Sequence, residues 1–197
     1  HALEVTADRF RQWRFGEVSH GQRLRYRRDS EYVDHFRDLL DKAVGARLRS
    51  VGPPAVMMSG GLDSTAVAAV GCRDRRTRSS RLASVSYVFN ELPSCDESAY
   101  IDAMATACGL ESLTIVGDQL WPLQGIDSWP RNPNTPLEGP YRRLREGIYR
   151  AAAQNGIRAL LTGEFGDELY AGGEYWLRDL LREHRWGASL AGVGKDR

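Results

Sequence analysis

Two glycines flanked by hydroxyl side chains follow a short apolar run in the segment AVMMSGGLDS, residues 55–64. Gly60 and Gly61 let the backbone come close to a ligand, because neither carries a Cβ. Consecutive backbone N–H groups can then form an anion cradle, to which the start of a following helix adds partial positive charge. Ser59 and Ser64 can donate hydroxyl hydrogen bonds to phosphate oxygens. This pattern predicts a site for the pyrophosphate part of ATP.

A carboxylate in the same segment indicates a metal ion. Asp63 is repelled by phosphate unless a cation lies between them. Mg²⁺ takes oxygen ligands from one or two carboxylates and from phosphates, so Asp63 predicts that ATP binds together with Mg²⁺. The alternative is an ordinary strand-to-helix turn in which Asp63 is the helix N-cap.

A second segment rich in glycine and acids, LLTGEFGDELYAGG at residues 160–173, also follows an apolar run. Asp167 would supply the second carboxylate ligand for Mg²⁺. Gly163 would let the backbone approach the substrate or the α-phosphate. For Glu164 and Glu168 an alternative stays open, because carboxylates near the start of a helix are favourable without any further role.

Alternating strands and helices must position these two segments. The predicted strands are the apolar runs 55–58, 82–89, 112–116 and 158–162, and the predicted helices between them are about 64–72, 96–108 and 141–155. This order predicts an α/β fold, a doubly wound parallel sheet with helices on both faces. The strands are apolar throughout, which indicates that both faces are covered. In such sheets, ligands bind beyond the carboxyl ends of the strands, where the direction of winding reverses.

The chain before the first of these strands divides into two parts. Residues 1–30 are rich in arginine and show no sustained periodicity, so we expect a linker or arm with at most a short strand pair. Residues 31–50 carry apolar side chains at helical spacing and predict an amphipathic, core-facing helix with Ser30 as its N-cap. The ATP-binding domain is therefore expected to span residues 31–197.

The two motifs together resemble those of a known family. SGGLDS resembles the PP-loop of the ATP pyrophosphatases, and LLTGEFGDELYAGG resembles the second motif of the asparagine synthetase family within that group. The resemblance covers roughly residues 31–177. It implies the adenine nucleotide alpha hydrolase-like fold. It also implies an AMP-forming ligase that activates a carboxylate as an acyl-adenylate, releases pyrophosphate and forms an amide with ammonia or an amine.

The resemblance also implies roles for individual residues. Glu164 would lie near the reacting carbonyl, and Glu168 would be a supporting partner of the metal site. The adenine base would lie against backbone groups between Ser84 and Val88, near Val85, although the side chain of Val85 fits an ordinary core position equally well. The residues implied to bind ATP are Ser59, Gly60, Gly61, Leu62, Asp63, Ser64, Val85 and Gly163.

The resemblance leaves other activities and partners open. The same family includes β-lactam synthetases and macrolactam cyclases of lasso peptides, so ring closure is one alternative, and a non-catalytic nucleotide-binding module is another. Glutamine-dependent members carry an N-terminal glutaminase, and we expect such a domain or a separate chain as a partner. The family also continues beyond the second motif, so we expect a C-terminal truncation. Phe165 replaces a small residue and could alter the acyl pocket.

Composition excludes several other classes of protein. The net charge of +1 gives no attraction toward nucleic acid or anionic membranes. No apolar run approaches the roughly 20 residues needed to cross a bilayer. Three scattered cysteines lack the spacing of a metal site or a disulfide framework and favour a reducing, cytoplasmic location.

Overall fold

The structure is a computed structural model. It describes residues 1–14, 16, 24–74, 82–129, 139–170 and 182. The chain divides into two units, residues 1–37 and residues 38–197, and each is described by itself.

The first unit contains a β-hairpin. Strands β1 (Ala2–Val5) and β2 (Phe10–Trp13) pair antiparallel. The Thr6 amide donates a hydrogen bond to the Arg9 carbonyl at 2.8 Å and closes the turn between them. The strands are almost entirely exposed, so the hairpin has no buried apolar face of its own.

Helix α1 (Asp29–Arg47) begins earlier than the sequence predicts. Ser30 lies inside the helix, so the expectation that it is the N-cap is wrong. The carboxylate of Glu31 instead accepts hydrogen bonds from the amides of Arg27 at 3.0 Å and Arg28 at 2.8 Å. A carboxylate in the first turn thus satisfies amides that precede the helix, much as in a capping box.

The predicted core-facing stripe of α1 is buried in the part of the helix that belongs to the second unit. Val44 and Leu48, at the end of the helix and just after it, are 4 % and 5 % exposed. Val33 and Phe36 are 45 % and 40 % exposed. The core-facing prediction is therefore confirmed for the end of α1, and for its first turns, which belong to the first unit, it stays a prediction.

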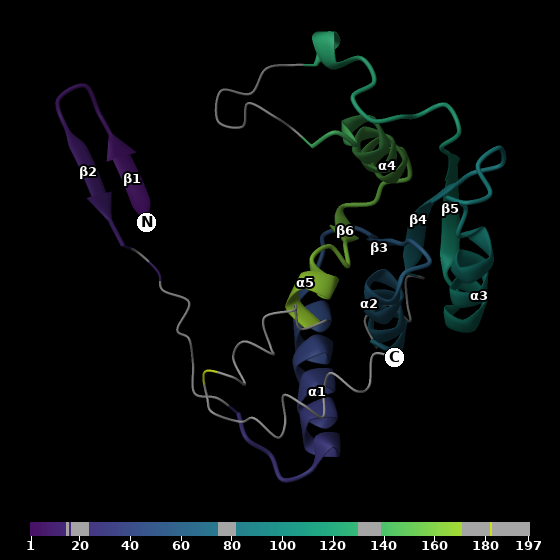
Figure 1. Ribbon diagram of the computed structural model, residues 1–197, viewed down its shortest axis with the longest axis horizontal. Helices are drawn as coiled ribbons and strands as arrows, with labels where there is room; N and C mark the ends of the chain where they lie inside the picture. The colour runs from purple at the N-terminus through teal and green to yellow at the C-terminus, as the bar shows by residue number, and fades with distance from the viewer. Residues whose placement is uncertain (15, 17–23, 75–81, 130–138, 171–181, 183–197) are drawn as a thin grey trace. The chain divides into compact units, whose positions relative to one another are not determined.

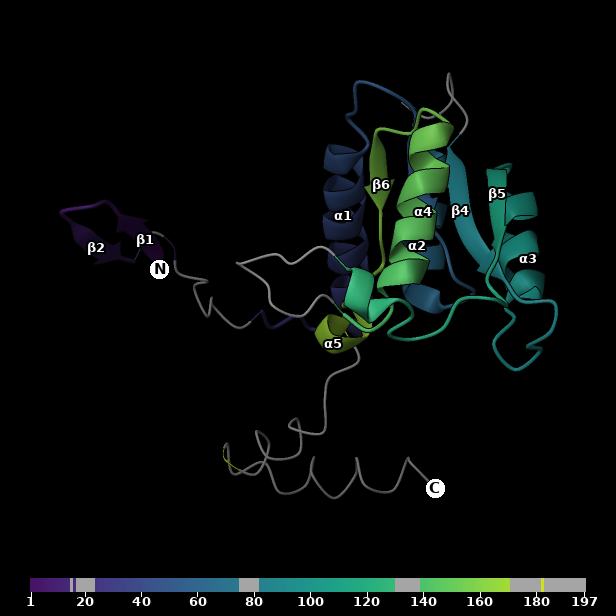
Figure 2. The ribbon, with the colours of Figure 1, turned by 90° about the horizontal axis from the view of Figure 1, so that it is seen from above.

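The second unit is built on a four-stranded parallel sheet (Figures 1 and 2). The strand order is β5-β4-β3-β6, and every pairing in this sheet is parallel. The strands are β3 (Pro54–Met57), β4 (Ala83–Val88), β5 (Glu111–Val116) and β6 (Ala159–Leu161).

Helices cover both faces of this sheet. One apolar cluster joins the end of α1, α2 (Leu62–Arg73) and α3 (Ser98–Cys108) to the side of the sheet that carries Val56. A second cluster joins α4 (Arg142–Gln154) to the opposite side, which carries Val85. Figure 2 shows α4 crossing in front of the strands with α2 behind them. The predicted fold class, an α/β doubly wound parallel sheet, is confirmed.

Local sequence explains how closely these helices pack. Gly71 of α2 lies close to the Leu82 side chain, because a Cβ there would be 2.8 Å from Leu82 Cδ2. Helix α3 ends at Cys108, and Gly109 is its C-cap with a φ of 62°, which suits glycine. The Leu110 amide then donates to the Ala105 carbonyl at 2.9 Å. None of the helices in the described residues is both long and apolar enough to span a membrane.

Strand β5 departs from the prediction of complete burial. Only Leu113 and Ile115 are half-buried, and both pack toward the α4 side. The remaining residues of the strand are exposed. β5 pairs with β4 alone within the described residues and is an edge of the sheet, which explains its partial burial.

The topology creates one switch point. The chain runs from β3 through α2 to β4 and through α3 to β5, always moving outward in one direction. Helix α4 then carries the chain back across the sheet to β6, on the other side of β3. The winding direction therefore reverses between β3 and β6, where open α/β sheets bind ligands beyond the strand ends.

Candidate functional site

The loops that follow β3 and β6 touch each other at the switch point. A Cβ at Gly163 would lie 2.5 Å from the backbone nitrogen of Ser64 and 2.7 Å from the carbonyl carbon of Asp63. A Cβ at Gly166 would lie 2.6 Å from both carboxylate oxygens of Asp63. Side chains cannot approach so closely, so glycine at both positions permits the contact. The two segments singled out in the sequence thus meet at one edge of the sheet.

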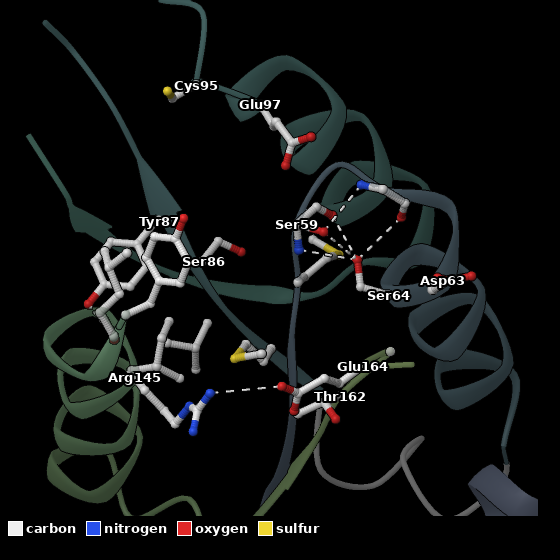
Figure 3. A pocket seen from close by; sticks show the side chains of 18 of the residues that line it. Ser59, Asp63, Ser64, Ser86, Tyr87, Cys95, Glu97, Arg145, Thr162 and Glu164 are labelled. Atoms are coloured by element: carbon white, nitrogen blue, oxygen red, sulfur yellow. Dashed lines mark hydrogen bonds and ion pairs between the residues drawn. The ribbon is translucent and has the colours of Figure 1, made fainter. Parts of the chain in front are cut away.

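Two serine hydroxyls organise the loop after β3. The Ser59 amide donates to Ser64 Oγ at 3.1 Å, and the two hydroxyl oxygens are 3.1 Å apart. Ser64 Oγ also lies 3.0 Å from the Ser59 carbonyl, and the Gly61 amide donates to Ser59 Oγ at 3.3 Å. Figure 3 shows these bonds. Both predicted phosphate-binding hydroxyls therefore also hold the turn in shape.

Asp63 does not cap the helix that follows. α2 begins at Leu62, and Gly61 is its N-cap without any side-chain capping bond. Asp63 lies within the first turn, and its carboxylate is directed to Gly166 rather than to an amide of its own helix. The alternative of an ordinary turn capped by Asp63 is therefore wrong.

The Gly60 amide has a partner far away in sequence. It donates a hydrogen bond to Glu97 Oε2 at 3.0 Å, across 37 positions of the chain. A Cβ at Gly60 would lie 2.9 Å from Tyr100 Cβ and 3.0 Å from Glu97 Cβ. Gly60 thus allows the start of α3 to approach the loop, and its amide is already directed at a carboxyl oxygen.

Three carboxylates gather around the contact between the loops. Asp167 and Glu168 lie in the first turn of α5 (Gly166–Tyr170). The Glu168 carboxyl donates a hydrogen bond to Asp167, which lowers the pKa of Asp167 and raises the pKa of Glu168. The negative charge of Asp63 raises the pKa of Glu168 further. The three groups are thus near enough to influence one another.

These carboxylates fit a magnesium ion that arrives with phosphate. They are hard oxygen donors, and neither Asp63 nor Asp167 forms an ion pair with a basic side chain within the described residues. The same residues contain no group of three or more acidic, histidine or cysteine side chains that could hold a metal by itself. A metal ion here would therefore need further ligands, such as phosphate oxygens.

Glu164 lies between the loop contact and helix α4. Its Oε1 is 3.9 Å from Arg145 Nη2, and both side chains are about half exposed (Figure 3). Glu164 precedes α5 by two residues and borders the pocket described below. Glu168 lies outside the described lining of that pocket, so for Glu168 the alternative of a helix-start carboxylate stays open.

A pocket of about 510 Å³ opens above the carboxyl ends of β3, β4 and β6. Of the predicted site residues, Gly60 and Asp167 do not border it within the described residues. Those that do border it are Ser59, Gly61, Leu62, Asp63, Ser64, Val85, Gly163 and Glu164. Val85 is also fully buried and packs with α4, so its core position is confirmed, while its place beside the base stays a prediction.

One wall of the pocket was not predicted from the sequence. It is formed by α4 and the residue that precedes it. The residues recur at three- and four-residue steps, a spacing that could have indicated a common helix face. They are Tyr141, Leu144, Arg145, Ile148 and Tyr149. Tyr87 joins this wall to the sheet, because its hydroxyl donates to the Leu144 carbonyl at 2.7 Å, and burial raises the pKa of Tyr87.

Phe165 does not shape this pocket. Its backbone has a φ of 69°, in the left-handed region that favours glycine, and its side chain is 63 % exposed. It is absent from the described lining of the pocket, so no contact supports the expected change to an acyl pocket.

Two curated relatives are similar to most of this chain. "Amidase chyE" of Penicillium rubens is 28 % identical over 174 residues, which are 82 % of this chain and 26 % of that relative. "Amidase chry2" of Gibberella zeae is 28 % identical over 176 residues, 83 % of this chain and 26 % of that relative. The chain therefore spans about a quarter of the length of these curated relatives.

The family comparison covers most of the chain. The model of the family described as asparagine synthase matches residues 35–195. This range includes both contacting loops and the four strands that position them. The chain therefore belongs to the asparagine synthase family, a family of ATP-dependent ligases.

Proposed function

We propose that the chain binds Mg·ATP and forms an amide bond, as the synthetase part of an AMP-forming carbon–nitrogen ligase. The observation that supports this most is the contact of the two loops at the switch point, with Gly163 and Gly166 against Ser64 and Asp63. This contact supports the proposal because it brings the glycine turn after β3 and the carboxylates to one edge of the sheet.

The loop after β3 would bind the pyrophosphate part of ATP. Its amides, the N-terminus of α2 and the hydroxyls of Ser59 and Ser64 supply donors and partial positive charge. Leu62 borders the same end of the pocket with an exposed side chain. The base would lie farther along β4, near Val85.

Asp63 and Asp167 would hold the metal ion. A bound Mg²⁺ neutralises phosphate charge and helps pyrophosphate to leave. The protein's own contribution is to keep the two carboxylates near the loop amides, since Asp63 is fixed against Gly166 and Asp167 follows directly in α5.

The reaction would proceed in two steps. A substrate carboxylate attacks the α-phosphate of ATP, pyrophosphate leaves, and an acyl-adenylate forms. Ammonia or an amine then attacks the acyl carbon, and AMP leaves. Glu164 would orient the amine and accept its proton, and its ion pair with Arg145 would hold its carboxylate at the border of the pocket.

An exchange assay tests this proposal. The chain is incubated with Mg·ATP, labelled pyrophosphate and a candidate carboxylate, and label in ATP is measured. Exchange that depends on aspartate supports asparagine formation. Exchange that depends on a β-amino acid or a peptide supports the alternative of ring closure, which the family also carries out. Binding of ATP without exchange supports a nucleotide-binding module, and absence of ATP binding contradicts the proposal.

A second candidate function comes from the names of the relatives. Both curated relatives are called amidases. An amidase would release ammonia from an amide without ATP, whereas a ligase would need ATP. Assays of ammonia release with and without ATP therefore separate the two candidates.

We further propose a source for ammonia and a location for the protein. A glutaminase, on the same polypeptide or on a separate chain, would supply ammonia to the pocket. The three cysteines are free, which is compatible with the reducing cytoplasm as the site of action. Ammonia production from glutamine in a preparation of the complete protein would test the first of these proposals.

A further inference from the structure

One buried hydroxyl in the pocket has no partner. Ser86 is 1 % exposed and borders the pocket, yet its Oγ has no hydrogen-bond partner within the described residues. A buried hydroxyl without a partner destabilises the folded protein, because it loses the hydrogen bonds that water would offer. A hydroxyl of this kind at a ligand pocket indicates that the ligand supplies the missing bond.

The same strand provides a contrasting serine. Ser84 lies two positions earlier on β4, on the same side of the sheet, and is equally buried. Its Oγ is 3.1 Å from Ser112 Oγ on β5, so its hydrogen bond is satisfied within the protein. Ser86 stands opposite Thr114 in the same register but forms no such bond. Of these two serines of β4, Ser86, which borders the pocket, is the one without a partner among the described residues.

The position of Ser86 indicates which part of a nucleotide it would meet. In Figure 3 it lies between Tyr87 on one side and Ser59 of the phosphate-binding loop on the other. The rings of Tyr87 and Phe89 both border the pocket, with centroids 6.3 Å apart and a tilt of 31°. A base near Val85 and the Tyr87 ring on one side, and phosphates near Ser59 on the other, leave the sugar beside Ser86.

We propose that Ser86 Oγ forms a hydrogen bond with a ribose hydroxyl of bound ATP and so makes the pocket specific for ribonucleotides. This inference rests on the proposed function, because it takes ATP as the ligand. A hydroxyl can both donate and accept, which matches the 2′ and 3′ hydroxyl groups of ribose.

Dissociation constants for ATP, 2′-deoxy-ATP and 3′-deoxy-ATP test the proposal. They are measured by calorimetry on the unmodified chain, on Ser86→Ala and on the control Ser84→Ala. The unmodified chain is expected to bind one deoxy analogue about 3- to 10-fold more weakly than ATP, the usual effect of one neutral hydrogen bond. Ser86→Ala should weaken ATP binding by a similar factor and remove its preference over that analogue, whereas Ser84→Ala should keep the preference.

The outcomes separate this inference from the proposed function. If the unmodified chain binds ATP but does not distinguish it from either analogue, the ribose contact is refuted while ATP binding stands. This measurement needs no variant, so it decides the question even if Ser86→Ala does not fold. If Ser86→Ala keeps the full preference for ATP, the inference is likewise overturned. If the chain binds none of the three nucleotides, both proposals fail.

Discussion

At the scale of single residues, the site depends on glycines that leave space for a neighbour. Gly163 and Gly166 do not have positive φ angles, so their role is not conformational freedom. Each marks a point where a side chain would collide with the start of α2. Gly60 has the same role toward α3. Three glycines of the two motifs are therefore explained by contacts between segments of the protein, before any ligand is considered.

Gly166→Ala should displace the carboxylate of Asp63, because the new methyl group would lie 2.6 Å from both of its oxygens. We expect Mg-dependent binding of ATP to weaken at least about 10-fold, which corresponds to about 1.4 kcal/mol. The control is Gly139→Ala, where the nearest atom to the new Cβ is Arg145 Nη2 at 3.7 Å. Equal ATP affinity of the two variants in calorimetry would contradict this role of Gly166.

At the scale of elements, α4 supports the pocket from one side of the sheet. Ile148 and Ala152 are its buried residues, and within the described residues no other helix contributes to that apolar cluster. The same helix presents Arg145 and Tyr149 to the pocket, one turn apart. Packing of α4 on Val85 therefore determines where its polar side chains lie.

Ile148→Ala should lower the free energy of unfolding by about 2–4 kcal/mol, since it removes a side chain that is 3 % exposed and leaves a cavity beneath the pocket. Gln154→Ala, at the exposed end of the same helix, should change it by less than about 0.5 kcal/mol. Urea unfolding followed by circular dichroism measures both. A loss below 1 kcal/mol for Ile148→Ala would show that α4 is not packed as described.

The opposite side of the sheet holds a pair of thiols where α2 and α3 end. Cys72 Sγ donates to Cys108 Sγ at 2.9 Å, and both residues are half-buried. Burial, together with the neighbouring Cys72, raises the pKa of Cys108 to about 12 from an ordinary value of 9.0. Cys95 is exposed, in the loop between β4 and α3.

Iodoacetamide at pH 8 should therefore label Cys95 in the folded chain and leave Cys108 unmodified, because the thiolate is the reactive form.

The unfolded Cys108 thiol loses its proton near pH 9, whereas the folded one keeps it until about pH 12. The unfolded state then binds fewer protons, so stability falls as pH rises through this interval, and Cys108→Ser should reduce that fall. Peptide mapping that finds Cys108 labelled as fast as Cys95 would refute the raised pKa of Cys108.

At the scale of the whole molecule, the sequence predicts the order of elements well. Apolar runs separated by amphipathic segments gave all four parallel strands and the three connecting helices, with ends that differ by a few residues. Periodicity records which faces are buried, and in a parallel sheet this is enough to place the strand ends. The order of strands and helices also predicted that the loops after β3 and β6 would lie at one edge of the sheet.

Contacts between distant segments could not be predicted in the same way. The hydrogen bond from Gly60 to Glu97, the pairing of Arg145 with Glu164 and the unpartnered hydroxyl of Ser86 all depend on how elements pack, which a single sequence does not state. The start of α1 was misplaced for a related reason. Ser30 is a good N-cap by type, but the Glu31 carboxylate satisfies the preceding amides instead.

The central claim is that the two loops at the switch point bind ATP through a metal ion held by Asp63 and Asp167. Calorimetric titration with ATP, once in Mg²⁺ and once in EDTA, tests it most directly. The four proteins are the unmodified chain, Asp63→Asn, Asp167→Asn and a control, Asp102→Asn. Asp102 is an exposed acid on α3. We predict that Mg²⁺ tightens ATP binding at least about 10-fold in the unmodified chain and the control, and much less in the other two variants. Equal effects of Mg²⁺ in all four proteins would contradict the claim.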